Sequence, residues 1–126
     1  MKLQPDRSDA QTISAHGPGW IGVDGEKITH NVIITSRGER IAWAASGRFE
    51  DLGKADFEQL ARLQADVVIF GSGPRIRFPR AAWLQPLYEK RIGVETMDTA
   101  AACRTYNILA QEGRDVAAAL LLEETA

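Results

Sequence analysis

The stretch Ala65-Asp66-Val67-Val68-Ile69-Phe70-Gly71-Ser72-Gly73 decides the fold. Its apolar run is short and continuous, and it ends in a glycine-rich turn, which is typical of a strand covered on both faces. Such strands pair in parallel through helical crossovers. The stretch therefore predicts an α/β domain whose first parallel strand covers residues 65–70.

The residues that follow alternate between helix and strand patterns. Pro79 favours the start of a helix that Pro86 should bend or shorten, and Asp98 is a typical N-cap of a second helix that Gly113 ends. The expected order is a helix at 79–91, a strand at 92–97, a helix at 99–112 and a strand at 115–122. This βαβαβ pattern predicts a carboxyl-terminal half with right-handed parallel crossovers.

The residues that precede the stretch indicate antiparallel hairpins. Asp24-Gly25 joins two short strand patterns and accepts the positive φ angles of a type I′ turn. A second hairpin is expected at residues 36–39, between strands at 31–35 and 40–45. After a connector at 46–53, Asp56 is expected to cap a helix, with Gln59 completing a capping box. The sequence thus predicts one mixed sheet preceded by hairpins.

Length and composition limit the chain to one ordinary domain. Its 126 residues suffice for a single core, and residues 1–10 are polar enough to form a loosely held tail before a domain at 11–126. A net charge of −2 argues against nucleic acid as a partner. No apolar stretch reaches the ~20 residues of a membrane helix, and the start lacks a secretory signal. We expect a cytoplasmic protein without membrane insertion.

Two amide-rich corners are the first candidate site. Gly71, Ser72 and Gly73 follow one predicted strand, and Asp98 and Thr99 begin the helix after the next. If the two strands are neighbours, both corners line one recess that could hold a small anion. The simpler interpretations are a tight turn that needs small residues and a helix whose amides Asp98 already caps.

Three arginines follow the glycine turn. Arg75 and Arg77, with Arg80 nearby, could present guanidinium forks to an anionic ligand, or they could form a solvated rim that pairs with acidic side chains or a partner protein. A complete dinucleotide fingerprint is absent, because position 76 is isoleucine and a proline follows the turn.

The remaining reactive groups predict little chemistry. Cys103 falls in the second turn of its helix and is expected to be a buried, inert thiol rather than a nucleophile. Tyr106 and Asn107 are candidate binding residues, although core and helix-to-loop hydrogen bonds explain them equally well. Two histidines and one cysteine have no metal-ligand spacing. We expect no metal, no cofactor and no catalytic residue.

The carboxyl-terminal half also resembles a known family. The segments Ile92-Gly93-Val94-Glu95-Thr96-Met97-Asp98-Thr99 and Ala101-Ala102-Cys103-Arg104-Thr105-Tyr106-Asn107 are similar to a small α/β family first typified by an archaeal hypothetical protein. Its eukaryotic relatives include a mitochondrial complex I assembly factor and an adipogenesis-associated protein. The family's motif positions are represented here by Gly71, Gly73, Met97, Thr99, Ala102, Thr105, Tyr106 and Asn107.

The resemblance implies a mixed sheet with helices on one side and hairpins on the other. It also implies a binding or assembly role through protein contacts. The start of the chain has no Arg- and Ser-rich leader, which favours a bacterial, cytoplasmic setting. Our first hypothesis is a non-enzymatic, assembly-factor-like module with a protein partner. The alternatives are a protein or enzyme that binds a small anion at the loop after residue 70, and a self-associating domain.

Overall fold

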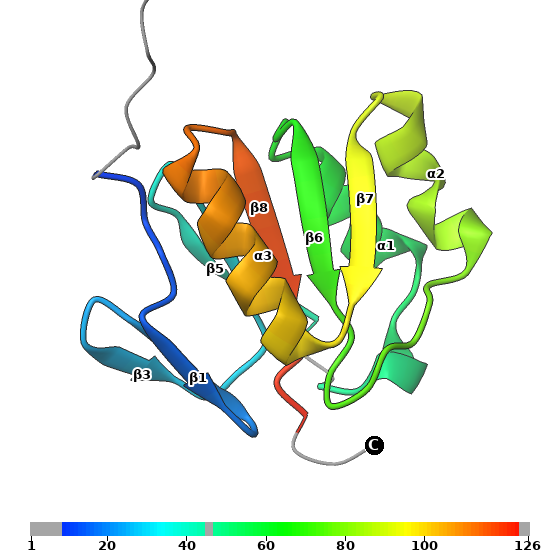
Figure 1. The fold of residues 1–126 in the computed structure, drawn as a ribbon. Helices are drawn as coiled ribbons and strands as arrows, with labels where there is room; N and C mark the ends of the chain where they lie inside the picture. The colour runs from blue at the N-terminus through cyan, green and yellow to red at the C-terminus, as the bar shows by residue number, and fades with distance from the viewer. Residues whose placement is uncertain (1–8, 45–46, 124–126) are drawn as a thin grey trace, which may run out of the picture.

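A mixed five-stranded sheet forms the centre of the molecule (Figure 1). The computed structural model describes residues 9–44 and 47–123. The sheet order is β5-β4-β8-β6-β7, with β6 parallel to β7 and β8, and with β4 antiparallel to β8 and β5. The strands are β4 (Val32–Thr35), β5 (Arg40–Ala42), β6 (Val67–Gly71), β7 (Gly93–Met97) and β8 (Val116–Leu120). The predicted βαβαβ half is confirmed.

The amino-terminal hairpins form as predicted. Strands β1 (Ala15–Gly17), β2 (Trp20–Val23) and β3 (Glu26–Ile28) make a separate antiparallel sheet. Its second turn places Asp24 at φ 52° and Gly25 at φ 79°, the left-handed conformations that a type I′ turn requires. The second predicted hairpin joins β4 to β5, which adds it to the large sheet rather than the small one.

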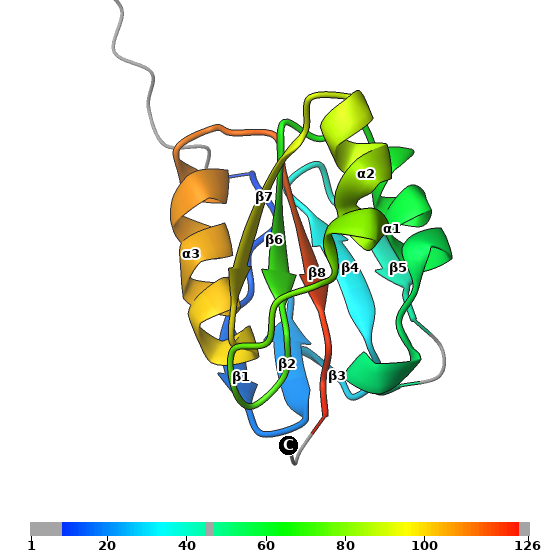
Figure 2. The same cartoon turned by 90° about the vertical axis from the view of Figure 1, so that its right-hand side faces the viewer.

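The helices cover both faces of the large sheet, which corrects the expectation of helices on one side only. Helices α1 (Lys54–Ala61) and α2 (Ala81–Glu89) lie on one face, together with the short 3-10 helix η1 (Phe49–Asp51) (Figure 2). Helix α3 (Thr99–Gln111) lies on the other face and shares it with the small sheet.

The strand order explains this arrangement. From β6 the chain crosses through α2 to β7 on one side, and from β7 it returns through α3 to β8 on the other side of β6. Right-handed crossovers that run in opposite directions place their helices on opposite faces. The loops that leave the carboxyl ends of β6 and β7 therefore run to opposite faces, and the strand order reverses between β6 and β8. This end of the sheet is a topological switch point, where open α/β sheets usually bind ligands.

Each face of the sheet buries its own apolar core. The α3 face joins Ile21, Ile69 and Tyr106, all fully buried, and the opposite face joins Trp43, Phe57 and Phe70. The rings of Phe57 and Phe70 meet edge to face, with their centroids 5.6 Å apart. Alternating residues of β6 and β8 thus serve both cores, which is why their sequences read as continuous apolar runs.

Two local expectations differ from the structure. Helix α1 begins at Lys54 with Gly53 as N-cap, and Asp56 lies inside it, where its carboxylate accepts the Gly53 amide at 2.9 Å. The aspartate therefore closes the capping box from its third position. Helix α2 covers Ala81–Glu89 rather than residues 79–91, with Arg80 and not Pro79 at its start, and Pro86 lies inside this shorter helix. The expected tail at 1–10 falls outside the described residues up to Ser8, and Ala10 already packs against the core.

Candidate functional site

The two predicted corners meet at the carboxyl ends of β6 and β7. Gly71 pairs with Met97 across the parallel strands, so the next residues of both segments lie side by side. A Cβ at Gly71 would stand 3.1 Å from the Thr99 Cα, which shows how closely α3 approaches the strand. The geometric prediction that joined Gly71, Ser72 and Gly73 to Asp98 and Thr99 is confirmed.

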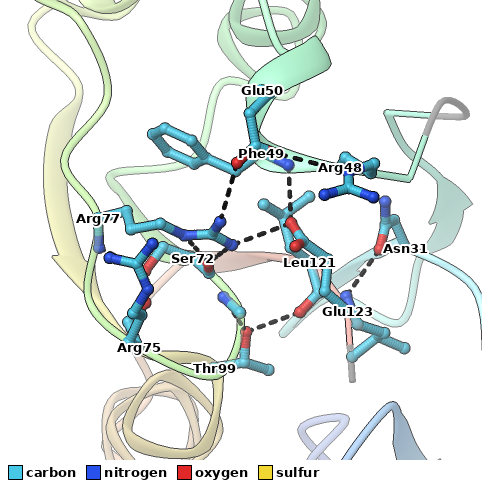
Figure 3. Close-up of polar contacts among 12 residues, drawn as sticks. Asn31, Arg48, Phe49, Glu50, Ser72, Arg75, Arg77, Thr99, Leu121 and Glu123 are labelled. Atoms are coloured by element: carbon cyan, nitrogen blue, oxygen red, sulfur yellow. Dashed lines mark hydrogen bonds and ion pairs between the residues drawn. The ribbon is translucent and has the colours of Figure 1, made fainter. Parts of the chain in front are cut away.

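Thr99 joins the two corners, which together are called the corner from here on. The Gly73 amide donates to the Thr99 Oγ1 at 2.8 Å, and the Thr99 amide donates to the Gly73 carbonyl at 2.9 Å. The same hydroxyl donates to the carbonyl of Leu121 at 2.7 Å (Figure 3). One side chain thus holds the glycine turn, the start of α3 and the segment after β8 in a fixed arrangement.

The amides expected to bind an anion are already used inside the protein. The Gly73 amide is bonded to the Thr99 hydroxyl, and the Thr99 amide is bonded to the Gly73 carbonyl. The Ala101 amide donates to the Asp98 carboxylate at 2.8 Å. Asp98 is therefore a helix cap, as the simpler interpretation held. Gly73 itself has φ 101°, a backbone conformation that favours glycine.

The side chain of Ser72 is buried and makes hydrogen bonds to the loop that follows β6. Its hydroxyl accepts the Arg77 amide at 2.9 Å and lies 2.7 Å from the carbonyl of Arg75 and 3.2 Å from that of Met97. A hydroxyl has one proton, and the shorter contact gives the Arg75 carbonyl as its main acceptor. Ser72 therefore fixes the backbone of the following loop at Arg75 and Arg77.

Arg77 is buried, in contrast to the exposed rim considered for the arginines. Its Nη2 lies 2.6 Å from the Ser72 carbonyl and 2.9 Å from the Glu123 carboxylate, and its guanidinium lies 4.7 Å from the ring centre of Phe49 (Figure 3). The Glu123 carboxylate also accepts the Phe49 amide at 2.7 Å. Arg77 thus binds an internal carboxylate and is not available to a ligand, whereas Arg75 is exposed.

One donor of this cluster has no hydrogen-bond partner in the described part of the chain. The Arg77 Nη1 is buried, and the nearest carboxylate is that of Glu50 at 3.6 Å. A backbone hydrogen bond is the main cause that lowers the pKa of Glu50, with further contributions from Arg48 and Arg77. Glu50 therefore stays ionised beside the arginine and supplies a second, looser counter-charge.

A recess of about 290 Å³ opens next to the corner. Of the predicted site residues, Gly73, Asp98 and Thr99 line it, whereas Gly71 and Ser72 do not. Its other lining residues are Pro74, Ala100, the β1–β2 turn with its flanking residues, and the segment after β8, namely His16, Gly17, Pro18, Gly19, Leu121, Leu122 and Glu123. Asp98 and Glu123 contribute carboxylates, and neither Arg75 nor Arg77 lines the recess. The recess is thus lined by two acidic residues and by no arginine or lysine, which disfavours the anion considered from the sequence.

Tyr106 and Asn107 lie about two turns along α3 and serve a different contact. The Tyr106 hydroxyl donates to the Gln11 carbonyl at 2.6 Å. The Asn107 side chain accepts the Ile13 amide and donates to the Ile13 carbonyl, each at 2.8 Å. The structure does not bring these two residues to the corner; they hold the segment before β1 against α3.

The cysteine is buried in the core on the α3 face. Burial raises the pKa of the Cys103 thiol to about 12, so the thiolate that a nucleophile needs is not formed near neutral pH. Within residues 9–44 and 47–123, no group of three His, Cys, Asp or Glu side chains could hold a metal ion. No helix of that part is both long and apolar enough to cross a membrane.

Fold and site define a small α/β domain whose switch point is closed by its own carboxyl-terminal segment. The chain belongs to the family described as protein of unknown function (DUF498/DUF598), whose model matches residues 13–121. It is 33% identical to an uncharacterised protein of Rhodobacter capsulatus, over 94% of this chain and 90% of that protein.

A second relative has a described role. The human NADH dehydrogenase [ubiquinone] 1 alpha subcomplex assembly factor 3 is 26% identical over 121 residues, which are 94% of this chain. The chain spans 65% of the length of that relative. The family resemblance stated from the glycine turn and from residues 92–99 and 101–107 is thereby confirmed.

Solved structures share the fold. A crystal structure of a protein from Bordetella parapertussis superposes with a TM-score of 0.83 at 36% identity, covering 90% of this chain and 97% of the other. A Bordetella pertussis protein described as a Mth938-like domain gives 0.81 at 30% identity, covering 99% and 95%. The mixed α/β fold is thus common to several bacterial proteins.

Proposed function

We propose that this domain is a non-catalytic protein-binding module that assists the assembly of a respiratory complex of the NADH dehydrogenase type. The supporting observation is the similarity to the human assembly factor along 94% of the chain. A bacterial, cytoplasmic setting, in which the domain acts on a complex at the membrane surface, is part of the same proposal.

The chemistry of the corner agrees with binding rather than catalysis. The thiol of Cys103 is protonated and buried, and the amides of Gly73, Thr99 and Ala101 are bonded inside the protein. Arg77, one of the two arginines considered for an anionic ligand, is neutralised by Glu123. The site residues thus stabilise the loops that a partner would contact, and exposed residues of these loops bind the partner.

Deletion of the gene in the organism that encodes the chain tests the proposal. We expect less assembled NADH dehydrogenase on a native gel, restored by the wild-type gene, with the amount of ATP synthase as an internal control. A tagged copy is expected to co-purify subunits of the NADH dehydrogenase. An unchanged amount of the assembled complex after deletion contradicts the proposal.

A small ligand in the recess is the second candidate, favoured by the cavity itself. A ligand at 100 times its dissociation constant stabilises a fold by about 2.7 kcal/mol. A thermal-shift screen with neutral, cationic and anionic compounds is therefore expected to find ligands of the first two classes. Ala100→Tyr, which fills the recess from an exposed position of α3, should abolish the shift. Equal shifts in this variant contradict binding there.

A further inference from the structure

The loop between β6 and α2 holds large apolar side chains in solvent. Phe78 is 70% exposed and Ile76 is 49% exposed. Among the described residues, the other large apolar side chains with comparable exposure are Tyr88 and Ile108, which lie on helices. Burial of a phenylalanine stabilises a fold, so exposure of Phe78 on this loop forgoes that stabilisation. Exposed aromatic and arginine side chains are typical of the centres of protein interfaces.

Hydrogen bonds and an ion pair on the buried side of this loop hold it against the domain. The Ser72 hydroxyl fixes the backbone at Arg75 and Arg77, and the Arg77 guanidinium is anchored on Ser72 and Glu123 (Figure 3). Arg77 points inward while its neighbours Ile76 and Phe78 stay exposed. A loop prepared in this way loses little conformational entropy on binding, which favours affinity.

The same loop is locally positive in a chain of net charge −2. No acidic residue occurs between Asp66 and Glu89, whereas three arginines do. Glu123 neutralises Arg77, but Arg75 and Arg80 are exposed and have no ion-pair partner among the described residues. The Arg80 guanidinium lies 5.9 Å from the ring centre of Trp83, which orients it beside the loop.

We infer that Arg75, Ile76, Phe78 and Arg80, here called the 75–80 surface, dock an acidic segment of a partner protein. Carboxylates of that segment pair with the two guanidinium groups, and an apolar side chain covers Phe78. Lipid-binding clusters usually contain four to eight cations, and the two here favour a protein over an anionic membrane. The inference rests on the proposed protein-binding function and assigns its surface.

Photo-crosslinking in the cells that encode the chain tests the inference. The photoreactive analogue p-benzoylphenylalanine replaces Phe78, and in a matched control it replaces Ile108, an exposed residue of α3 on the opposite face. We expect an adduct from position 78 whose partner peptide, identified by mass spectrometry, has an excess of Asp and Glu. Position 108 is expected to give none with that peptide.

Reversal of the charges of Arg75 and Arg80 is the second test of the inference. Arg75→Glu combined with Arg80→Glu is expected to lower the yield from position 78 about tenfold, since like charges then face each other. Arg104→Glu combined with Arg114→Glu makes the same change of net charge at exposed positions elsewhere, and the yield should stay unchanged.

The outcomes separate the inference from the proposed function. An adduct from position 108 alone overturns the 75–80 surface but leaves a protein-binding role intact, and no adduct from either position contradicts both. An adduct from position 78 with lipid, with a second copy of this chain, or with a peptide that has no acidic excess also overturns the inference. So does an equal loss of yield in both pairs of arginine variants.

Discussion

The pair formed by Arg77 and Glu123 is the contact on which the corner depends most. Both side chains are only 7% exposed, and their carboxylate–guanidinium distance is 2.9 Å. Glu123 also holds the Phe49 amide, so the pair joins the loop after β6, the segment after β8 and η1. Removal of one member of a buried pair leaves an uncompensated charge, which costs about 3–5 kcal/mol.

Arg77→Met is therefore expected to lower the free energy of unfolding by about 3 kcal/mol. Glu123→Gln should cost less, because the amide oxygen still accepts from Arg77. We expect the double variant to be more stable than the sum of the single losses indicates, by at least about 1 kcal/mol. Urea denaturation of the four proteins measures this coupling, and additive losses would show that the two groups act independently.

Cys103 permits a prediction about pH. Burial raises the pKa of Cys103 to about 12, whereas a thiol in an unfolded chain has a pKa of about 8.5. Above that pH the unfolded chain releases a proton that the folded chain retains. The free energy of unfolding should therefore fall as pH rises from about 8.5 to 12, by up to about 1.4 kcal/mol per pH unit.

The variant Cys103→Ala isolates this effect, since Tyr106, whose pKa burial also raises, is present in both proteins. We expect a shallower loss of stability at alkaline pH in the variant, measured by denaturation at several pH values. A disulfide reagent should also label the native thiol of the wild type only slowly near pH 8. Parallel pH profiles and rapid labelling of the folded protein would contradict the buried thiol.

At the scale of elements, Gly71 sets the distance between β6 and α3. A Cβ at this position would meet the Leu120 side chain at 2.9 Å, the Ala102 Cβ at 3.1 Å and the Thr99 backbone at 3.1 Å. The leucine can rotate, but α3 would have to move as a whole. Gly71→Ala is therefore expected to destabilise the fold by about 1–3 kcal/mol, the usual cost of overpacking.

Gly93 in β7 is the matched control. A Cβ there finds its nearest neighbour, a Val67 methyl, at 3.8 Å, which is an ordinary contact. Gly93→Ala should be neutral or stabilising by a few tenths of a kcal/mol, since alanine restricts the unfolded chain. Thermal melts of the two variants compare them directly. Equal melting temperatures would mean that α3 adapts without cost.

The elements that the sequence predicts correctly carry local signals. Asp24-Gly25, the Asp98 cap and the apolar runs of β6 and β8 each specify structure within a few residues. The features that the sequence does not predict depend on contacts between residues far apart in the chain. The face that α3 covers follows from the insertion of β8 between β4 and β6.

The burial of Arg77 likewise depends on distant pairing, with a carboxylate 46 positions away. The local pattern of apolar and polar residues predicts neither the face that α3 covers nor the burial of Arg77. For the candidate site, the corner could therefore be predicted, but its closure by the carboxyl-terminal segment could not.

At the scale of the whole molecule, the last strand is also the central one. Strand β8 pairs with β4 on one side and with β6 on the other, and its residues are fully buried from Val116 to Leu120. It therefore links the amino-terminal hairpin of the large sheet to the βαβ half. Both apolar cores use its side chains. Neither half of the sheet is complete until β8 is in place.

A chain that ends at Arg114 is expected to lose cooperative folding, because it leaves β4 and β6 without their shared partner and exposes both cores. We expect no cooperative thermal transition by circular dichroism. Addition of a peptide of residues 115–126 should restore the transition, since the peptide supplies β8 together with Glu123 for Arg77. A peptide with Glu123→Gln should bind more weakly than the wild-type peptide. If the shortened chain melts cooperatively by itself, β8 closes a sheet that is already folded, and the switch point forms without its carboxyl-terminal segment.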